Sequence, residues 1–302
     1  MGLISSAVNG ALEAMGEGMM GAGGGFLKGG YSVWRAFGEI TVSYVQKEPE
    51  SFGAWSMVTG SIYTLSMAVA AALIVVVFLI SWVRDSIDIR NNLNFDSMFK
   101  FFIRYILTAG LIVNSLALIS SISQCATAVV ATIGNTEMKQ DAPDDMFEDA
   151  KEKMEDEDAD GLDWFITGII AIAGGFLGGL VIIVCAVQLV LAVLSRLFKM
   201  FLCIPFAPVA LSGFAGGREF SQSGIAWLRT FTGYALEAVV IVLAIAISMS
   251  LFTDGGLFQI DGEESYQIAM ILQICGYCMP MLAACASVKG AEMVVRRCLG
   301  LG

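Results

Sequence analysis

The 302-residue chain contains no histidine, only five prolines and few charges: Asp, Glu, Lys and Arg make up 15% of it, against 57% hydrophobic residues. Without histidine the chain lacks the commonest general acid or base and the commonest metal ligand, which argues against an enzyme and a resident cofactor. A mean hydropathy of +0.75 excludes an ordinary pair of soluble domains. The 33 glycines are typical of closely packed membrane helices.

The excess of negative charge is concentrated in one segment. Residues 137–163 hold 13 acidic residues and three lysines, a net charge of −10, whereas the rest of the chain carries only −1 of the total −11. No general basic surface for nucleic acid remains. The seven cysteines lie outside this acidic segment, mostly in apolar runs, so the sequence predicts no disulfide framework.

Five apolar runs are long enough to cross a bilayer core of roughly 30 Å. Between the third and fourth runs lies an apolar stretch, residues 200–215, that Pro205 and Pro208 interrupt. Proline removes a backbone donor and disfavours helix in the preceding residue, so this stretch is a poor straight span. The sequence predicts an all-α polytopic membrane protein with about five transmembrane helices and a proline-broken re-entrant or interfacial hairpin. The predicted spans are residues 56–83, 101–134, 164–194, 230–252 and 268–288.

The orientation follows from lysine and arginine counts in the loops. Basic residues gather in the loop 84–100 and the adjoining start of the second span, beside the hairpin and in the tail 289–302, which are predicted to be cytoplasmic. The loop 135–163 is acidic and the loop after Phe252 has no basic residue, so both are predicted to face outward. The predicted organisation is an extracytoplasmic region 1–54, transmembrane helices 1 and 2 in residues 55–134, and helices 3 to 5 in residues 164–288.

Residues 1–54 show apolar residues at helical spacing, which predicts amphipathic helices on a membrane or on a neighbouring helix. Glycines at 21 and 23–25 predict a flexible break between two such helices. The same tract ends in Lys28 followed by Gly29, and no strand precedes it, so it does not match a phosphate-binding loop.

The deepest ionisable side chain in the predicted spans is Glu237. Burying a carboxylate in a bilayer costs about 2.5 kcal/mol or more, so Glu237 is expected to face a bundle interior, a water path or a neighbouring subunit. A functional role and a structural ion pair both remain open. In the third span, glycines at spacing four predict close helix packing: Gly174, Gly175, Gly178 and Gly179. Four tryptophans are predicted to form an interfacial belt: Trp55, Trp82, Trp164 and Trp227.

The acidic segment also contains half of a calcium-loop pattern. Asp156, Asp158 and Asp160 alternate before Gly161, but the twelfth position is Thr167, which cannot supply a bidentate carboxylate. A solvated acidic loop is the preferred interpretation over a weak calcium site, and no metal site is predicted.

Residues 160–250 resemble a known family. The run Arg196-Leu-Phe-Lys199, the segment Pro205-Phe-Ala-Pro208, the turn Gly216-Gly217-Arg218 and the entry through Trp227 into a long apolar span are similar to TrbL-like polytopic inner-membrane subunits of type IV secretion and conjugation machines. Five spans, an outer N-terminal region and a cytoplasmic tail are similar to the organisation of that family.

The resemblance implies a non-enzymatic oligomer, a ring in the bacterial cytoplasmic membrane, that forms part of a translocation channel or its platform. Separate ATPases would supply energy, bitopic scaffold proteins would be further partners beside membrane lipid, and DNA with attached protein would be the transient cargo. The assembly candidates are Glu237, Arg196, Lys199, Pro205, Pro208 and Arg218. The alternative is a secondary transporter or small-solute permease, with Glu237 and the helix broken at Pro205 and Pro208 as its site; no counterpart of that broken helix occurs elsewhere in the chain.

Overall fold

The computed structural model describes residues 2–87, 95–137, 142, 146–156, 159–217, 219–253 and 265–300. Within these ranges all regular structure is helical, and five stretches have the length and apolar composition of membrane spans. The all-α, multi-pass class is therefore confirmed. The α-helices are α1 (Gly2–Gln46), α2 (Gly53–Met57), α3 (Tyr63–Ile87), α4 (Phe95–Val113), α5 (Ser115–Glu137), α6 (Glu148–Asp156), α7 (Gly161–Cys203), α8 (Ala207–Ser212), α9 (Ser221–Thr253) and α10 (Tyr266–Cys298).

The chain divides into two compact units, and α7, α9 and α10 each contribute to both. The first unit comprises Met1–Tyr44, Thr132–Ala192 and Ile241–Lys289, and the second comprises Val45–Ala131, Val193–Val240 and Gly290–Gly302. Each long helix exceeds what a bilayer requires, since 43 residues of α7 reach roughly 65 Å.

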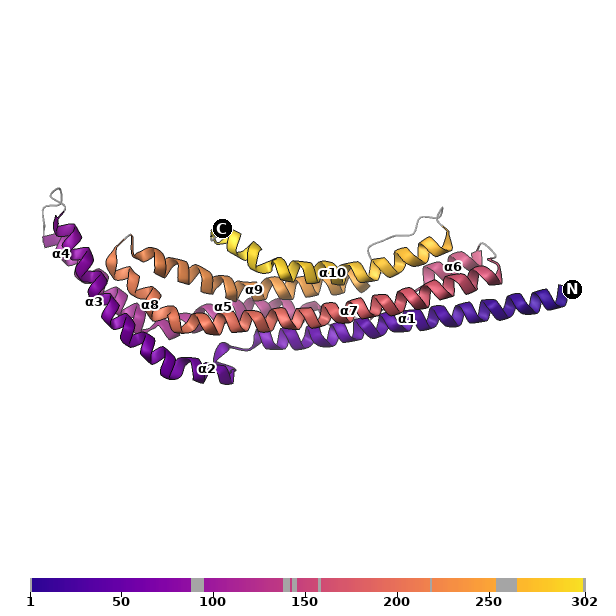
Figure 1. The fold of residues 1–302 in the computed structure, drawn as a ribbon, viewed down its shortest axis with the longest axis horizontal. Helices are drawn as coiled ribbons and strands as arrows, with labels where there is room; N and C mark the ends of the chain where they lie inside the picture. The colour runs from indigo at the N-terminus through magenta and orange to yellow at the C-terminus, as the bar shows by residue number, and fades with distance from the viewer. Residues whose placement is uncertain are drawn as a thin grey trace. The chain divides into compact units, whose positions relative to one another are not determined.

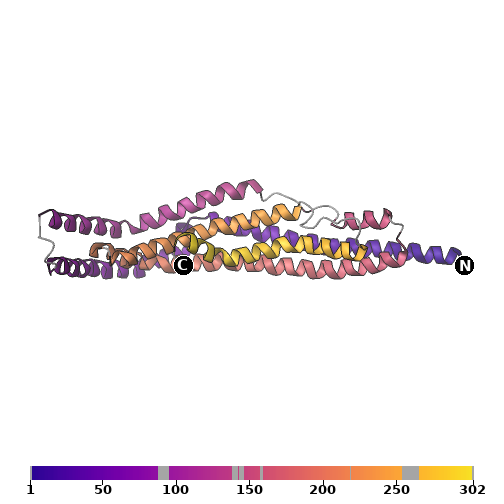
Figure 2. The same cartoon turned by 90° about the horizontal axis from the view of Figure 1, so that it is seen from above.

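In the first unit, α1 lies along α7, and the two helices run in the same direction (Figures 1 and 2). Glycines at seven-residue spacing on α1, at positions 16, 23 and 30, meet glycines 168, 175 and 179 of α7. A Cβ added at Gly30 would lie 2.9 Å from the Cα of Gly179, and one added at Gly168 would lie 2.7 Å from the carbonyl oxygen of Gly16. Only glycine allows this approach, so the spacing sets a close backbone contact.

The predicted flexible break at glycines 21–25 is wrong, because α1 is one continuous helix from Gly2 to Gln46. Glycine weakens an isolated helix by about 1 kcal/mol relative to alanine. Here the cost is offset by packing: Gly23 is buried against the backbone of Ala171. The side chains of Tyr31 and Trp34, further along α1, are almost completely buried.

The same unit joins α7 to α10 and the end of α9. Gly174 meets Ile274, and Gly178 meets Cys278, so α7 and α10 also run parallel. The ring of Phe252 stacks on Tyr31 at a centroid distance of 4.1 Å and lies 5.0 Å from the ring of Tyr277. All four predicted packing glycines of the third span thus lie at helix contacts.

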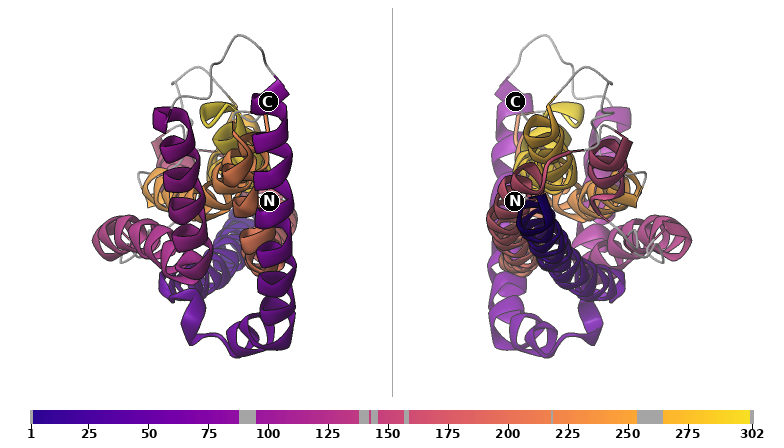
Figure 3. Two further views of the ribbon diagram at one scale, coloured as in Figure 1. Left: turned by 90° about the vertical axis from the view of Figure 1, so that its left-hand side faces the viewer. Right: turned by 90° about the vertical axis from the view of Figure 1, so that its right-hand side faces the viewer.

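In the second unit, α8 packs against both α3 and α4, and Figure 3 shows orange segments between the two purple helices. Ser81 of α3 donates a hydrogen bond of 2.7 Å to the carbonyl oxygen of Gly216. Gly217 then adopts a φ of 81°, which only glycine adopts readily, and the chain turns into α9. A buried hydrogen bond between the hydroxyls of Tyr63 and Ser115 joins α3 to α5.

The second predicted span is divided in two. The long apolar run at residues 101–134 breaks between Val113 and Ser115, so α4 and α5 are separate helices. The break carries Asn114, whose amide donates to the carbonyl oxygen of Gly110 at 2.8 Å. The backbone N–H of Asn114 bonds the same carbonyl oxygen at 3.0 Å, and the N–H of Leu118 bonds the carbonyl of Asn114 at 3.1 Å, so the interruption is confined to one residue. Of the two, only residues 115–133 of α5 have the length and hydropathy of a span.

The proline-containing stretch 200–215 remains helical but is broken where the prolines occur. The last turn of α7 ends at Cys203, a 3-10 turn covers Ile204–Phe206, and α8 begins at Ala207. Because Pro208 has no N–H for the carbonyl of Ile204, the N–H of Ala207 bonds that carbonyl instead. The chain reverses after this segment, at Gly217. The re-entrant or interfacial position of this stretch in the bilayer stays a prediction.

Candidate functional site: a buried charge cluster

Arg196 of α7 is buried in the second unit, with 4% of its surface exposed. Its Nε donates to the carbonyl oxygen of Tyr234 at 2.6 Å, and its Nη2 donates to that of Ala235 at 3.4 Å. Each carbonyl oxygen has two lone pairs and can accept a second bond inside the helix α9. The guanidinium, with its fixed fork of donors, therefore ties α7 to the backbone of α9.

Glu237 follows these carbonyls on α9 and is 6% exposed. Its carboxylate interacts electrostatically with Lys199 and Arg196, both on α7. Its Oε2 has no hydrogen-bond partner among the residues that the structure describes. A buried carboxylate is tolerated only near opposite charge, so Glu237 depends on these two cations.

Lys199 connects this core to α10. Its Nζ forms an ion pair with Glu292, and Glu292 also pairs with Arg296 one turn later, at 3.1 Å. The Nζ of Lys199 lies 5.9 Å from the centre of the Tyr234 ring, within cation–π range. Three cations and two carboxylates thus join α7, α9 and α10. We name Arg196, Lys199, Glu237, Glu292 and Arg296 the charge cluster.

Sequence reasoning found Arg196, Lys199 and Glu237 separately but missed that Glu292 completes the set. The fifth span was predicted to end at residue 288, whereas α10 continues to Cys298. The spacing of four between Glu292 and Arg296 is the signal that could have extended the helix, since such pairs stabilise helices. Tyr234 has no comparable signal, because its role comes from its carbonyl oxygen and ring.

The proline segment lies in the same unit. With the N–H of Ala207 turned to Ile204, the carbonyl of Cys203 loses its usual helical partner, and the indole Nε1 of Trp227 donates to it at 3.0 Å. Trp227 also stacks on Phe231 at 5.4 Å. Trp227 and Trp164 are 7% and 5% exposed, which leaves little of either ring for an interfacial belt, whereas Trp55 and Trp82 are half-buried.

Two predicted sites fall wholly or partly outside the described residues. Arg218 lies outside them, as do Asp158 and the side chain of Asp156, while Asp160 is exposed. In the ranges that the structure does describe, no group of three His, Cys, Asp or Glu residues could hold a metal ion. The preferred interpretation, a solvated acidic loop without a metal site, stays a prediction.

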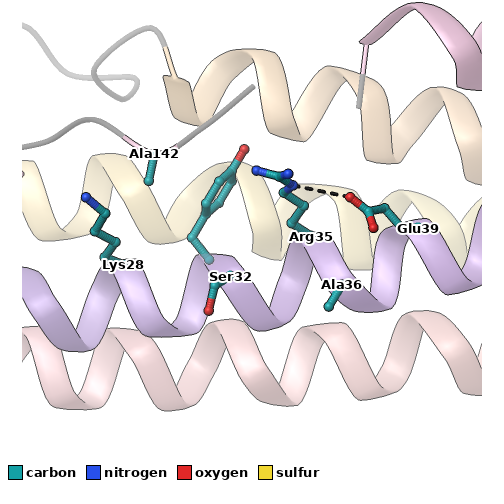
Figure 4. Close-up of a pocket in the computed structure, with 7 residues that line it drawn as sticks. Lys28, Ser32, Arg35, Ala36, Glu39 and Ala142 are labelled. Atoms are coloured by element: carbon teal, nitrogen blue, oxygen red, sulfur yellow. Dashed lines mark hydrogen bonds and ion pairs between the residues drawn. The ribbon is translucent and has the colours of Figure 1, made fainter. Parts of the chain in front are cut away.

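A pocket of about 460 Å³ lies beside α1 in the first unit. Figure 4 shows Lys28 and Arg35 reaching toward Ala142, which belongs to the acidic segment, while Ser32 points away. Arg35 also pairs with Glu39 through a 3.3 Å contact. Lys28 and Arg35 of α1 thus line this pocket together with Ala142.

The geometry defines a class: a multi-pass helical membrane protein in which the buried charges of Arg196 and Glu237 and the half-exposed ion pairs of Glu292 join three long helices. The model of the TrbL/VirB6 plasmid conjugal transfer protein family matches residues 82–288, which include α7, α9 and most of the charge cluster. The chain belongs to this family, and it is therefore a component of conjugative transfer or type IV secretion machinery. No curated protein matches the chain.

Proposed function

We propose that the chain is a non-enzymatic channel or platform subunit of a conjugative type IV secretion machine, oligomerising in the cytoplasmic membrane to help translocate a DNA–protein substrate. The family match over residues 82–288 carries the proposal. Separate ATPases would power the transfer, and bitopic scaffold proteins would adjoin the subunit.

The distribution of burial leaves apolar faces for contacts outside the chain. More than half of the residues in the most apolar segments of α9 and α10 are buried within the chain. In the corresponding segments of α3 and α5 fewer than a quarter are buried. Large apolar side chains on α3 and α4 are correspondingly exposed, including Leu65 at 68% and Leu107 at 67%. Such faces contact lipid or further subunits. The charge cluster would keep the central helices in register inside each subunit.

The permease alternative gains no support from the site. Glu237 lies among Arg196, Lys199, Glu292 and Arg296, which is the arrangement of a structural ion cluster. A coupling carboxylate would need to be freed and reloaded in each transport cycle. The conjugal transfer family also favours the secretion function.

Crosslinking in mating cells tests the proposal. Donor cells that lack the gene are expected to lose plasmid transfer and to regain it with the wild-type gene. Formaldehyde crosslinking during transfer should recover the transferred strand with the protein, and recovery should require the ATPases. The detergent-solubilised particle should have the mass of several copies. Absence of crosslinked DNA together with a strictly monomeric particle would refute the channel role.

The predicted outward loop suggests a second test. Residues 137–163 carry a net charge of −10, which would repel phosphates and keep a passing strand from binding at the mouth. Replacing the acidic residues in 156–160 by lysine should therefore lower the transfer frequency without lowering the amount of protein. Unchanged transfer would count against this role.

A further inference from the structure

A groove of about 520 Å³ lies between α7 and α10 in the first unit. Its lining is mostly apolar and includes Leu177, Val184 and Leu282, whose exposed fractions are 62%, 53% and 43%. Both helices belong to the apolar stretches with the composition of membrane spans. A hollow of this kind in a membrane is filled by hydrocarbon, because neither water nor a polar ligand is stabilised there.

We propose that this groove binds an anionic phospholipid, with one acyl chain along the apolar lining and the phosphate paired with Lys289. The lipid is defined by its chemistry: a hydrocarbon chain joined to a negatively charged phosphodiester. The proposal goes beyond the secretion function and does not depend on it.

Two polar side chains of the groove contact each other. The thiol of Cys285 donates to Oε1 of Gln188 at 3.3 Å, and its sulfur lies 3.6 Å from the carbonyl oxygen of Cys185. Both side chains belong to the lining. Apart from the side-chain amide of Gln188 and Lys289 at its end, the groove is lined by apolar side chains and cysteine, which suits an acyl chain and disfavours a polar solute.

The one cation of the lining, Lys289, is exposed at the C-terminal limit of the groove on α10. It forms no ion pair with any acidic residue in the described ranges. Lys289 lies seven residues beyond Leu282, roughly 10 Å along the helix. An ammonium on a flexible stem at the edge of an apolar slot reaches the headgroup region and attracts anionic lipid there.

Charge complementarity favours lipid over a second copy of the chain. A helix from another copy would cover the apolar lining but would have to supply a carboxylate opposite Lys289, whereas an anionic phospholipid brings hydrocarbon and phosphate in one molecule. The predicted cytoplasmic position of Lys289 also agrees, because that leaflet is rich in anionic lipid.

Native mass spectrometry of the full-length protein from mixed micelles tests the site, with phosphatidylglycerol competing against phosphatidylcholine. The wild-type protein should retain phosphatidylglycerol preferentially. Lys289→Ala should reduce that preference about fivefold, the effect of one interfacial lysine. Arg297→Ala removes an exposed cation of the same helix outside the groove and should leave the preference unchanged.

Val184→Trp, which fills the groove, should release both lipids while Lys289 remains in place. Because Lys289 is exposed, its alanine variant is expected to fold, and that variant alone can refute the proposal. Equal retention of the two lipids by the wild type, or no change with Lys289→Ala, would overturn it. So would a Val184→Trp variant that dissociates the oligomer but keeps its lipid, since the groove would then be an interface between copies. These results do not depend on plasmid transfer, so they are separate from a failure of the secretion proposal.

Discussion

Gly175 of α7 lies against Gly23 of α1 so closely that a methyl group on Gly175 would overlap the backbone of Gly23. The contact repeats at intervals of seven residues along α1. Parallel helices that keep a seven-residue repeat stay in contact along their whole shared length. The long N-terminal helix is thus part of the helical core of its unit, in contact with a predicted transmembrane helix.

Substitutions at two neighbouring glycines of α1 should have opposite effects. Gly23→Ala should lower the free energy of unfolding by about 1 to 3 kcal/mol, because the added methyl overlaps the backbone of Ala171. Gly25→Ala should raise it by up to about 1 kcal/mol, because its position is open and alanine favours helix. Thermal unfolding in detergent measures both. Equal effects of the two changes would show that α1 does not pack on α7 as described.

The charge cluster should behave as a coupled unit. Arg196→Met or Glu237→Met alone should destabilise the protein by about 1 to 3 kcal/mol, because Arg196→Met removes the donors to the carbonyls of Tyr234 and Ala235, and each variant removes a nearby opposite charge from the other buried group. The double variant should be less destabilised than the sum of the two, since both charges are gone. A double-mutant cycle on thermal unfolding measures the coupling. Simple additivity would mean that the two side chains do not interact.

Trp227 should stabilise the proline break through its indole N–H. Trp227→Phe keeps an aromatic ring but removes the indole donor to the carbonyl of Cys203, which should cost about 0.5 to 1.5 kcal/mol. Trp55→Phe serves as the control, because its side chain is half-buried and a surface change of this kind alters stability by about 0.5 kcal/mol or less. A cost for Trp227→Phe no greater than that of the control would assign the role to ring packing alone.

Two ion pairs of the second unit should differ in sensitivity to substitution. Arg84 and Glu219 form an exposed pair, with 63% and 67% of their side chains accessible. Glu219→Gln should change stability by about 1 kcal/mol or less, and added salt should erase the difference. Glu292→Gln removes the partner of both Lys199 and Arg296 and should cost more. The comparison uses unfolding temperatures at low and high salt. Equal losses of stability for the two variants would show that the ion pairs of Glu292 are as weak as the exposed pair of Arg84 and Glu219.

The predicted orientation is open to direct measurement. Fluorescent protein fused after the C-terminus should fluoresce, because the tail with Arg296 and Arg297 is predicted to be cytoplasmic. Alkaline phosphatase inserted in the acidic segment 137–163 should be active, because that loop is predicted to face outward. The reverse pattern would invert the predicted topology.

The sequence by itself determined the membrane class, the main apolar runs and the uneven charge, because hydropathy and loop charge are local properties of a chain in a bilayer. It did not show that α1 runs unbroken through glycines 21–25. Glycine weakens an isolated helix, and only the contact of Gly23 with a neighbouring backbone shows why the helix continues. Nor did it show that Glu292 lies in one cluster with Lys199 and Glu237, because dozens of residues separate these three positions in the sequence. Only the tertiary structure brings these groups together, because helix packing sets which distant residues share a buried environment.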